Sequence, residues 1–265
     1  MVATSRTDTA FNLGTFLISD GPAGFLLSWV AGFVDTAAFI VLFGLFTAHV
    51  TGNLALAGSS FVGSDVESTI TRLLMIPTFM TAVALTSLLA RFARRRNWSV
   101  FAVLLTAEAI ALGIFLLIGK SLSPALLLDV QEELILPIGI AGVIAMAIQN
   151  ALMKESKGVF KSYIPTTVMT GNTTQFTIDV VQFLSAKLSH PSGKSPNPEA
   201  DEAFERMSRV FPTLIGFALG GLAAACFVPL VEFWSITLPL IIISILAIAA
   251  YMQHNRLSSA HSDSH

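Results

Sequence analysis

The most specific polar signal in this sequence is the tripeptide Thr-Gly-Asn, which occurs twice. Threonine and asparagine side chains cap helix N-termini, and glycine permits backbone conformations that are closed to other residues. A short helix starting there at membrane depth would point the positive end of its dipole at the membrane centre. Each copy therefore predicts either a helix break, where polar groups could contact a solute, or a capped helix in a water-exposed loop. The copies are Thr51, Gly52 and Asn53, and Thr170, Gly171 and Asn172.

A carboxylate lies within the first apolar stretch. Asp35 is surrounded in sequence by the apolar residues of 29–41. An ionisable side chain at membrane depth is costly and normally faces the protein interior, so Asp35 is a candidate for binding a proton or a cation. The alternative is a structural pairing with a polar group. His49, two residues before the first Thr-Gly-Asn, is a secondary candidate for proton relay or gating, or an interfacial histidine without a special role.

The two motifs lie at matching places in two similar halves, about 22–118 and 134–251. Gln149 takes the place of Asp35 in the second half and is followed by Asn150. Asp35 precedes its motif by 16 residues, and Gln149 precedes its own by 21. This pattern predicts a two-fold internal repeat. The repeat is inverted if each half crosses the membrane three times, which we prefer, and parallel if each half crosses four times.

Three further polar residues are secondary site candidates. Glu108 is a second acid inside an apolar run, with fewer polar neighbours than Asp35. Gln175 and Asp179 share one face of the helix after the second motif, which could line a water-filled path or lie at the cytoplasmic interface. No phosphate-binding loop, zinc motif, nucleophile elbow or cysteine pair is present, so we expect no enzymatic activity, no metal site and no cofactor.

The composition indicates an integral membrane protein. Only 12% of the 265 residues are charged and 54% are hydrophobic. This balance excludes a disordered chain and a nucleic-acid-binding protein, and so few charges could not cover a soluble domain. Gly216 and Gly220 match the small-xxx-small pattern of closely packed membrane helices. Six apolar runs reach the roughly 20 residues that span a bilayer: about 22–46, 70–90, 100–118, 134–153, 210–231 and 234–251.

These runs predict an all-α, polytopic membrane helical bundle with six strong transmembrane helices and two short Thr-Gly-Asn helices. Counting the two short helices as full crossings gives eight, which stays an alternative. A polar N-terminal tail would occupy 1–20 and a C-terminal tail 253–265. A single membrane domain would fill 21–252, with 189–205 as a flexible loop.

Loop charges orient the predicted helices. With six crossings, the basic loops fall on the cytoplasmic side and the acidic loops fall outside, as the positive-inside rule requires. We therefore expect a multi-pass protein of the bacterial inner membrane with both termini in the cytoplasm. The basic residues concerned are Arg91, Arg94, Arg95, Arg96, Lys154, Lys157, Lys161 and Arg256.

Two stretches resemble the signatures of the YoaK-like family of bacterial membrane proteins. In the first half, the Gly-Phe-Val-Asp of 32–35 runs into 44–53, which ends in Thr-Gly-Asn. In the second half, 145–151 followed by 166–172 resembles the second signature of that family. The resemblance covers roughly 20–252. It implies a polytopic inner-membrane protein with about six helices, and it implies no particular activity, because that family is essentially uncharacterised.

The sequence predicts a transporter or channel for a small solute or ion, with a site between the two halves. Asp35 would be the binding or coupling acid, and the Thr-Gly-Asn motifs with Gln149 and Asn150 would add polar contacts. One alternative is a membrane scaffold or assembly protein without transport, and another is an intramembrane enzyme acting on a lipid or quinone. The expected partners are the lipid bilayer and an unidentified small solute or ion. A homo-oligomer is left open, and no nucleic acid is expected.

Overall fold

The computed structural model describes residues 13–129, 132–156, 166–189 and 198–262, and in these ranges it is helical without any β-strand. The all-α prediction is therefore confirmed. The α-helices are α1 (Leu13–Leu17), α2 (Asp20–Val41), α3 (Val50–Val62), α4 (Val66–Arg95), α5 (Val100–Asp129), α6 (Ile135–Glu155), α7 (Met169–Ser189), α8 (Pro198–Val231) and α9 (Thr237–Ser262). Short 3-10 helices occupy Glu132–Leu134 and Glu232–Ile236.

The long helices have the length and apolar composition of membrane spans. Five stretches of the described chain qualify, and the last of them, Pro198–Arg256, contains both α8 and α9. Each of the six predicted runs corresponds to one long helix, and the two Thr-Gly-Asn motifs open α3 and α7. The chain is therefore a polytopic helical bundle, as predicted.

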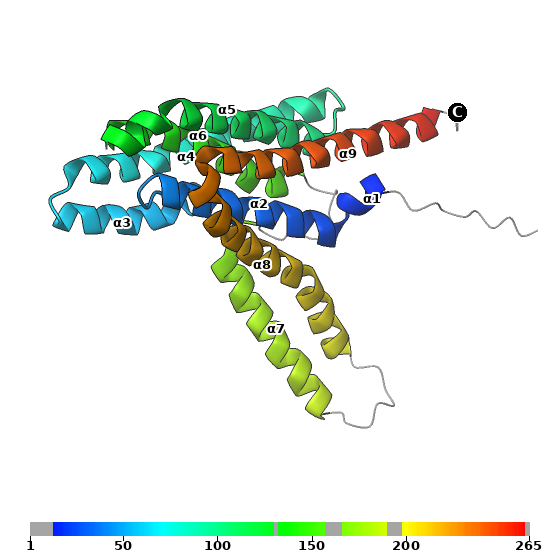
Figure 1. The fold of residues 1–265 in the computed structure, drawn as a ribbon. Helices are drawn as coiled ribbons and strands as arrows, with labels where there is room; N and C mark the ends of the chain where they lie inside the picture. The colour runs from blue at the N-terminus through cyan, green and yellow to red at the C-terminus, as the bar shows by residue number, and fades with distance from the viewer. Residues whose placement is uncertain (1–12, 130–131, 157–165, 190–197, 263–265) are drawn as a thin grey trace, which may run out of the picture.

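The bundle is built from pairs of helices that are distant in sequence. Helix α2 packs along α8, α4 packs along α6, and α5 lies against both α6 and α9 (Figure 1). Helix α1 rests on α9, so the first described helix and the end of α9 lie at the same end of the bundle. These pairings place α2 and α6 at its centre, which agrees with the many buried residues on both helices.

Glycines let α2 and α8 approach each other closely. A Cβ added at Gly220 would lie 2.0 Å from the carbonyl oxygen of Trp29, and one at Gly216 would lie 2.4 Å from that of Phe25. On the opposite helix, a Cβ at Gly32 would lie 2.2 Å from the carbonyl oxygen of Phe217. The predicted packing role of Gly216 and Gly220 is confirmed, because no side chain fits between the two backbones.

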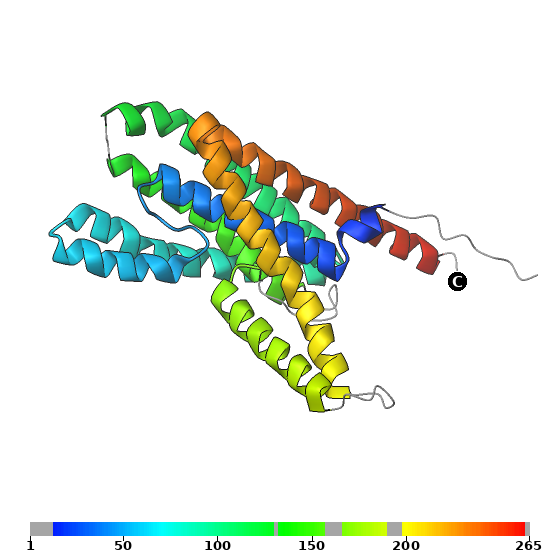
Figure 2. The same ribbon diagram turned by 60° about the horizontal axis from the view of Figure 1, so that its bottom comes forward.

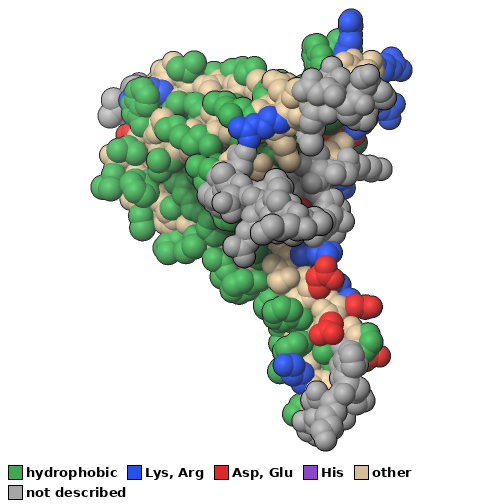
Figure 3. All heavy atoms as spheres, turned by 90° about the vertical axis from the view of Figure 1, so that its right-hand side faces the viewer, with side chains coloured by type: hydrophobic (Ala, Val, Ile, Leu, Met, Phe, Trp, Pro, Cys, Tyr) green, Lys and Arg blue, Asp and Glu red, His purple; other side chains and the backbone are tan. Residues whose placement is uncertain are grey.

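Two helical hairpins project from the bundle. Helix α3 packs on the first part of α4, and α7 packs on the first part of α8, which diverges from the other helices (Figure 2). Figure 3 shows hydrophobic side chains along one side of the α7–α8 hairpin and the acidic side chains on the other. The exposed hydrophobic residues include Ile178, Val181, Leu184 and Phe204.

Several boundaries differ from the sequence prediction. Helix α8 begins at Pro198, so the second part of the predicted loop 189–205 is helical. A proline at the first helical position, with Glu199 and Asp201 in the first turn, suits a helix start. Helix α9 continues through most of the predicted tail, as far as Ser262.

The connection between α3 and α4 is a tight, capped turn. The Asp65 carboxylate accepts a hydrogen bond from the Ser68 backbone N–H at 3.0 Å, which caps the N-terminus of α4. Hydrogen bonds from Ser68 hold the pKa of the exposed Asp65 carboxyl below its usual value. The turn therefore fixes α3 against α4.

Candidate functional site

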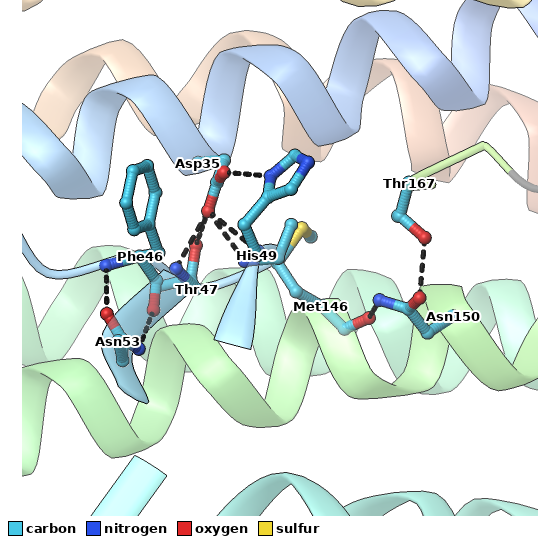
Figure 4. A network of polar contacts seen from close by, with 9 residues as sticks. Asp35, Phe46, Thr47, His49, Asn53, Met146, Asn150 and Thr167 are labelled. Carbon is cyan, nitrogen blue, oxygen red and sulfur yellow. Dashed lines mark hydrogen bonds and ion pairs between the residues drawn. The ribbon is translucent and has the colours of Figure 1, made fainter. Parts of the chain in front are cut away.

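The Asp35 carboxylate binds the backbone segment that leads into α3. Its Oδ1 accepts hydrogen bonds from the backbone N–H groups of Thr47 at 2.8 Å and Ala48 at 2.7 Å, with that of His49 at 3.4 Å (Figure 4). Asp35 is only 3% exposed. The positive end of the nearby helix dipole also favours a carboxylate at this place. Asp35 of α2 thus anchors the residues just before α3, whereas the N-cap residue of α3, His49, makes no side-chain cap hydrogen bond.

Asp35 also pairs with His49. The His49 Nδ1 lies 2.6 Å from the Asp35 Oδ2, and the imidazole edge meets the Phe217 ring of α8 at a centroid distance of 5.4 Å. Since a carboxylate oxygen can only accept, Nδ1 carries the proton and Nε2 of a neutral imidazole keeps its lone pair. The side chain of His49 is 35% exposed, whereas that of Asp35 is buried. The pair therefore joins a buried charge to a partly accessible base.

Asn53 is the inward-facing residue of the first motif. Its Oδ1 accepts from the Phe46 N–H at 2.9 Å, and its Nδ2 donates to the Phe46 carbonyl at 2.8 Å. Thr51 is exposed, and a Cβ at Gly52 would lie 2.9 Å from the Phe46 ring. Asn53 thus closes the loop before α3. The absence of a side chain at Gly52 leaves room for the Phe46 ring.

Helix α3 begins beside α2 rather than beyond its end. The residues just before α3 donate hydrogen bonds to Asp35, which lies six residues, or about 9 Å of helix, before the end of α2 at Val41. After Val41 the chain therefore doubles back along α2 before α3 starts. Phe43 and Gly44 make this reversal with positive φ angles of 50° and 83°.

The doubled-back segment 42–49 is held between helices. Gly139 and Gly142 of α6 leave space for Leu45 and Thr47, since added Cβ atoms would lie 2.4 Å and 2.7 Å from their side chains. From α4, Arg72 donates to the carbonyl oxygen of Gly44 at 2.6 Å. Irregular backbone at membrane depth requires such enclosure by protein.

The second half places polar groups on α6. Gln149 is buried and donates from Nε2 to the Leu27 carbonyl of α2 at 2.5 Å, while its Oε1 has no hydrogen-bond partner in the described part of the chain. Asn150 accepts from the Thr167 hydroxyl at 2.5 Å and donates to the Met146 carbonyl at 2.9 Å (Figure 4). Gln149 therefore ties α6 to α2, and Asn150 ties the segment before α7 to α6.

The second Thr-Gly-Asn repeats the orientation of the first. Thr170 and Gly171 are exposed, and Asn172 is buried. The Asn172 Nδ2 donates to the Thr213 hydroxyl of α8 at 3.4 Å. In both motifs, then, the asparagine faces the protein and the threonine faces away.

The secondary candidates lie apart from this cluster. Glu108 is fully buried in α5, and neither of its carboxylate oxygens has a hydrogen-bond partner among the described residues. The buried Asp179 pairs with Arg206 of α8 at 2.8 Å, and Gln175 donates to Asp179 at 3.1 Å. The polar face of α7 therefore joins α7 to α8. No hydrogen bond within the described ranges links Glu108 or Asp179 to Asp35.

Sequence reasoning missed Thr47, Arg72, Thr167 and Phe217. Arg72 carried a signal, because it is a charge within an apolar run. Thr47 and Phe217 depend on the doubled-back loop and on α8, and Thr167 depends on the packing of the segment before α7 on α6.

A cleft lies away from the Asp35 cluster. It has a volume of about 510 Å³ between α4, α5 and α6. Its lining is apolar apart from threonines and contains no acid, base or Thr-Gly-Asn residue. The lining residues include Leu74, Thr78, Thr81, Leu85 and Ile148.

The family of the chain follows from a comparison with known families. Residues 23–249 match a family described as protein of unknown function (DUF1275). The chain belongs to this family. The match covers nearly the whole stretch on which the sequence resembles an uncharacterised bacterial membrane family. No curated protein and no solved structure matches the chain.

Proposed function

We propose that the chain moves a small solute or ion across the bacterial inner membrane, with a site at Asp35, His49, Asn53, Gln149 and Asn150. The observation that carries this proposal is the Asp35–His49 pair at the start of a helix that begins beside α2. Ionisable groups inside a membrane protein face its interior and mark ion or substrate pathways. Helix ends within the membrane are a recurring feature of transporter sites.

We further propose that 22–118 and 134–251 form an inverted repeat. The packing of α2 on α8 has a counterpart in that of α6 on α4, and the α3–α4 hairpin has one in α7–α8. Helices α2 and α6 run in opposite directions (Figure 2). Each half would cross the membrane three times, and the site would lie between α2 and α6, near the axis that relates the halves.

The arginine-rich end of α4 supports cytoplasmic termini. Arg94 pairs with Glu155 at the end of α6, with Nη2 and Oε2 2.6 Å apart. These helix ends lie at the end of the bundle that holds α1 and the end of α9 (Figures 1 and 2). Basic residues at this end favour the cytoplasmic side for all of them.

Transport can be tested with the protein reconstituted in proteoliposomes. Solid-supported-membrane electrophysiology and radiolabelled uptake would screen inorganic ions and small organic acids, amines and amides. For any solute that moves, we expect Asp35→Asn and Asn53→Ala each to lower the flux at least about tenfold. Asp65→Asn is the matched control, because it removes a capping carboxylate in an exposed turn. Unchanged flux in both site variants would refute the proposed site.

A scaffold without transport is the second candidate. The glycine contacts between α2 and α8 leave no space between these backbones, as expected for a rigid structural core. Absence of flux for every tested solute, together with a protein partner lost on substitution of the exposed α7–α8 hairpin, would favour the scaffold. The intramembrane enzyme has less support, because the cleft between α4, α5 and α6 has no acid or base in its lining.

A further inference from the structure

We propose that the ion taken up at the Asp35–His49 pair is a proton, and that a metal cation such as Na⁺ is excluded there. The atom that receives the proton is His49 Nε2. This inference rests on the proposed transport function and names its coupling ion. It depends on the hydrogen bonds that occupy the carboxylate, on the free nitrogen of the imidazole and on the surrounding charges.

Hydrogen bonds already engage both oxygens of the Asp35 carboxylate. Oδ1 accepts from Thr47 and Ala48, and Oδ2 accepts from His49. A hard cation requires several free oxygen ligands around it. Here it would meet the N–H groups that already donate to the carboxylate. The same carboxylate in an open polar cavity would have been a good cation ligand.

The His49 imidazole has a nitrogen available for a proton. Nδ1–H is engaged by Asp35, and no hydrogen-bond partner of Nε2 lies among the described residues. Uptake forms one N–H bond from the Nε2 lone pair and an incoming proton, and gives an imidazolium beside a carboxylate. Release reverses this step without any further reactant. A histidine is suited to this exchange near neutral pH.

Asp35 is the charged group in direct contact with His49. The other charged residue on α2 is Asp20, fifteen residues before Asp35. On α8, the charged residue nearest to Phe217 in sequence is Arg209. On α6, Lys154 and Glu155 lie at the helix end, with Glu155 paired to Arg94. Arg72 of α4 faces the carbonyls of Phe43 and Gly44. The protonation of His49 is therefore governed by Asp35.

Proton uptake would change the charge where the two halves meet. His49 belongs to the segment before α3, and its ring rests on Phe217 of α8, from the second half. The amides of Thr47 and Ala48 share the Asp35 carboxylate with this ring. We therefore expect these amides to respond when His49 is protonated.

Nuclear magnetic resonance of the full chain in lipid nanodiscs tests the inference. Protein labelled with ¹⁵N in histidine and in the backbone is titrated from about pH 5 to 8.5, once in NaCl and once in choline chloride. The chain has five histidines, so His49→Gln assigns the signal by its loss. His254→Gln, in α9, is the matched control. We expect His49 Nε2 to gain a proton reversibly, and the Thr47 and Ala48 amides to shift with the same midpoint in both salts.

Two results would overturn the proton inference. One is a His49 ring that does not titrate in this range, or one that titrates while the Thr47 and Ala48 amides stay fixed. The other is a shift of those amides with Na⁺ at constant pH. Flux measurements separate this inference from transport itself. Flux that Asp35→Asn abolishes, but that a Na⁺ gradient drives and a pH gradient does not, refutes the proton and leaves transport intact. Coupled titration without flux of any tested solute leaves the proton site intact and refutes transport.

Discussion

At the scale of single residues, one carboxylate carries most of the organisation of the site. Asp35 binds the backbone just before α3, pairs with His49 and is buried. The sequence identified Asp35, His49 and Asn53 because polar residues stand out in apolar surroundings. Their mutual contacts could not be predicted, because they depend on a chain reversal at Phe43 and Gly44 that no sequence pattern predicts.

Asn53 is expected to stabilise the fold through its paired contacts with Phe46. Asn53→Ala leaves a backbone donor and a backbone acceptor without their partner, and should lower the free energy of unfolding by about 1–3 kcal/mol. Thr51→Ala is the control, because Thr51 is exposed, and it should change stability by less than about 0.5 kcal/mol. Unfolding in mixed micelles, followed by circular dichroism, measures both. Equal effects would contradict the role given to Asn53.

Glu108 is expected to be dispensable for stability. Its buried carboxyl has no hydrogen-bond partner in the described structure, so it gains nothing to offset its desolvation. Glu108→Leu should leave the free energy of unfolding unchanged or raise it by about 1 kcal/mol. Glu155→Leu, which removes contacts to Ser87 and Arg94, should lower it. A marked loss of stability in Glu108→Leu would reveal a partner for this acid.

At the scale of helices, the features that could be predicted were those marked by a hydrophobic periodicity or by the length of an apolar run. The six long helices follow from such patterns, and so do the two helices at the Thr-Gly-Asn motifs, although of these only α3, with 13 residues, is short as predicted, whereas α7 has 21. Helix ends were less predictable: the first apolar run continues to Phe46, but the helix stops at Val41 because the segment 42–49 bonds to Asp35 and Arg72 instead. Such tertiary contacts override local preference.

The α2–α8 contact should not tolerate even a methyl group. Gly220→Ala would place a Cβ 2.0 Å from the Trp29 carbonyl oxygen, so we expect a loss of about 1–3 kcal/mol in the free energy of unfolding. Gly113→Ala, in α5, has no atom within 4 Å of the added Cβ and should be neutral or stabilising by up to about 1 kcal/mol. Thermal unfolding of the two variants in the same detergent compares them. A tolerated Gly220→Ala would disprove the close approach.

The α7–α8 hairpin should depend on Arg206 more than on its neighbour Arg209. Arg206→Gln leaves the buried Asp179 without its ion pair and should destabilise the hairpin more than Arg209→Gln does. Arg209 pairs with the exposed Glu205, so Arg209→Gln should cost less than about 1 kcal/mol. Hydrogen exchange of the α7 amides reports the difference. Similar exchange in both variants would argue against a structural role for Asp179.

At the scale of the whole molecule, the sequence predicted a helical membrane bundle but not which helices pack together. The pairings of α2 with α8 and α4 with α6 join residues far apart in the chain. A single sequence carries no direct signal for such contacts beyond small residues such as Gly216 and Gly220. The inverted repeat remains a prediction that these pairings support.

The inverted arrangement predicts that the two hairpin tips lie on opposite sides of the membrane. Single cysteines at Gly63 and Ser185, both exposed, are introduced after replacing the sole cysteine by Cys226→Ala. In oriented vesicles, a charged thiol reagent should label position 63 only from outside and position 185 only from inside. Labelling of both from inside would instead establish the eight-crossing, parallel arrangement.

The α2–α8 contact also sets an order of events during synthesis. Phe217, which meets Gly32, is added 185 residues later. At roughly 5–20 residues per second, the ribosome needs about 10–40 s to reach it. During this interval α2 lacks its main neighbour, although the partners of Asp35 at residues 47–49 are already made. We therefore expect the small-residue face of α2 to be covered by the insertion machinery or by a temporary contact until α8 has been synthesised.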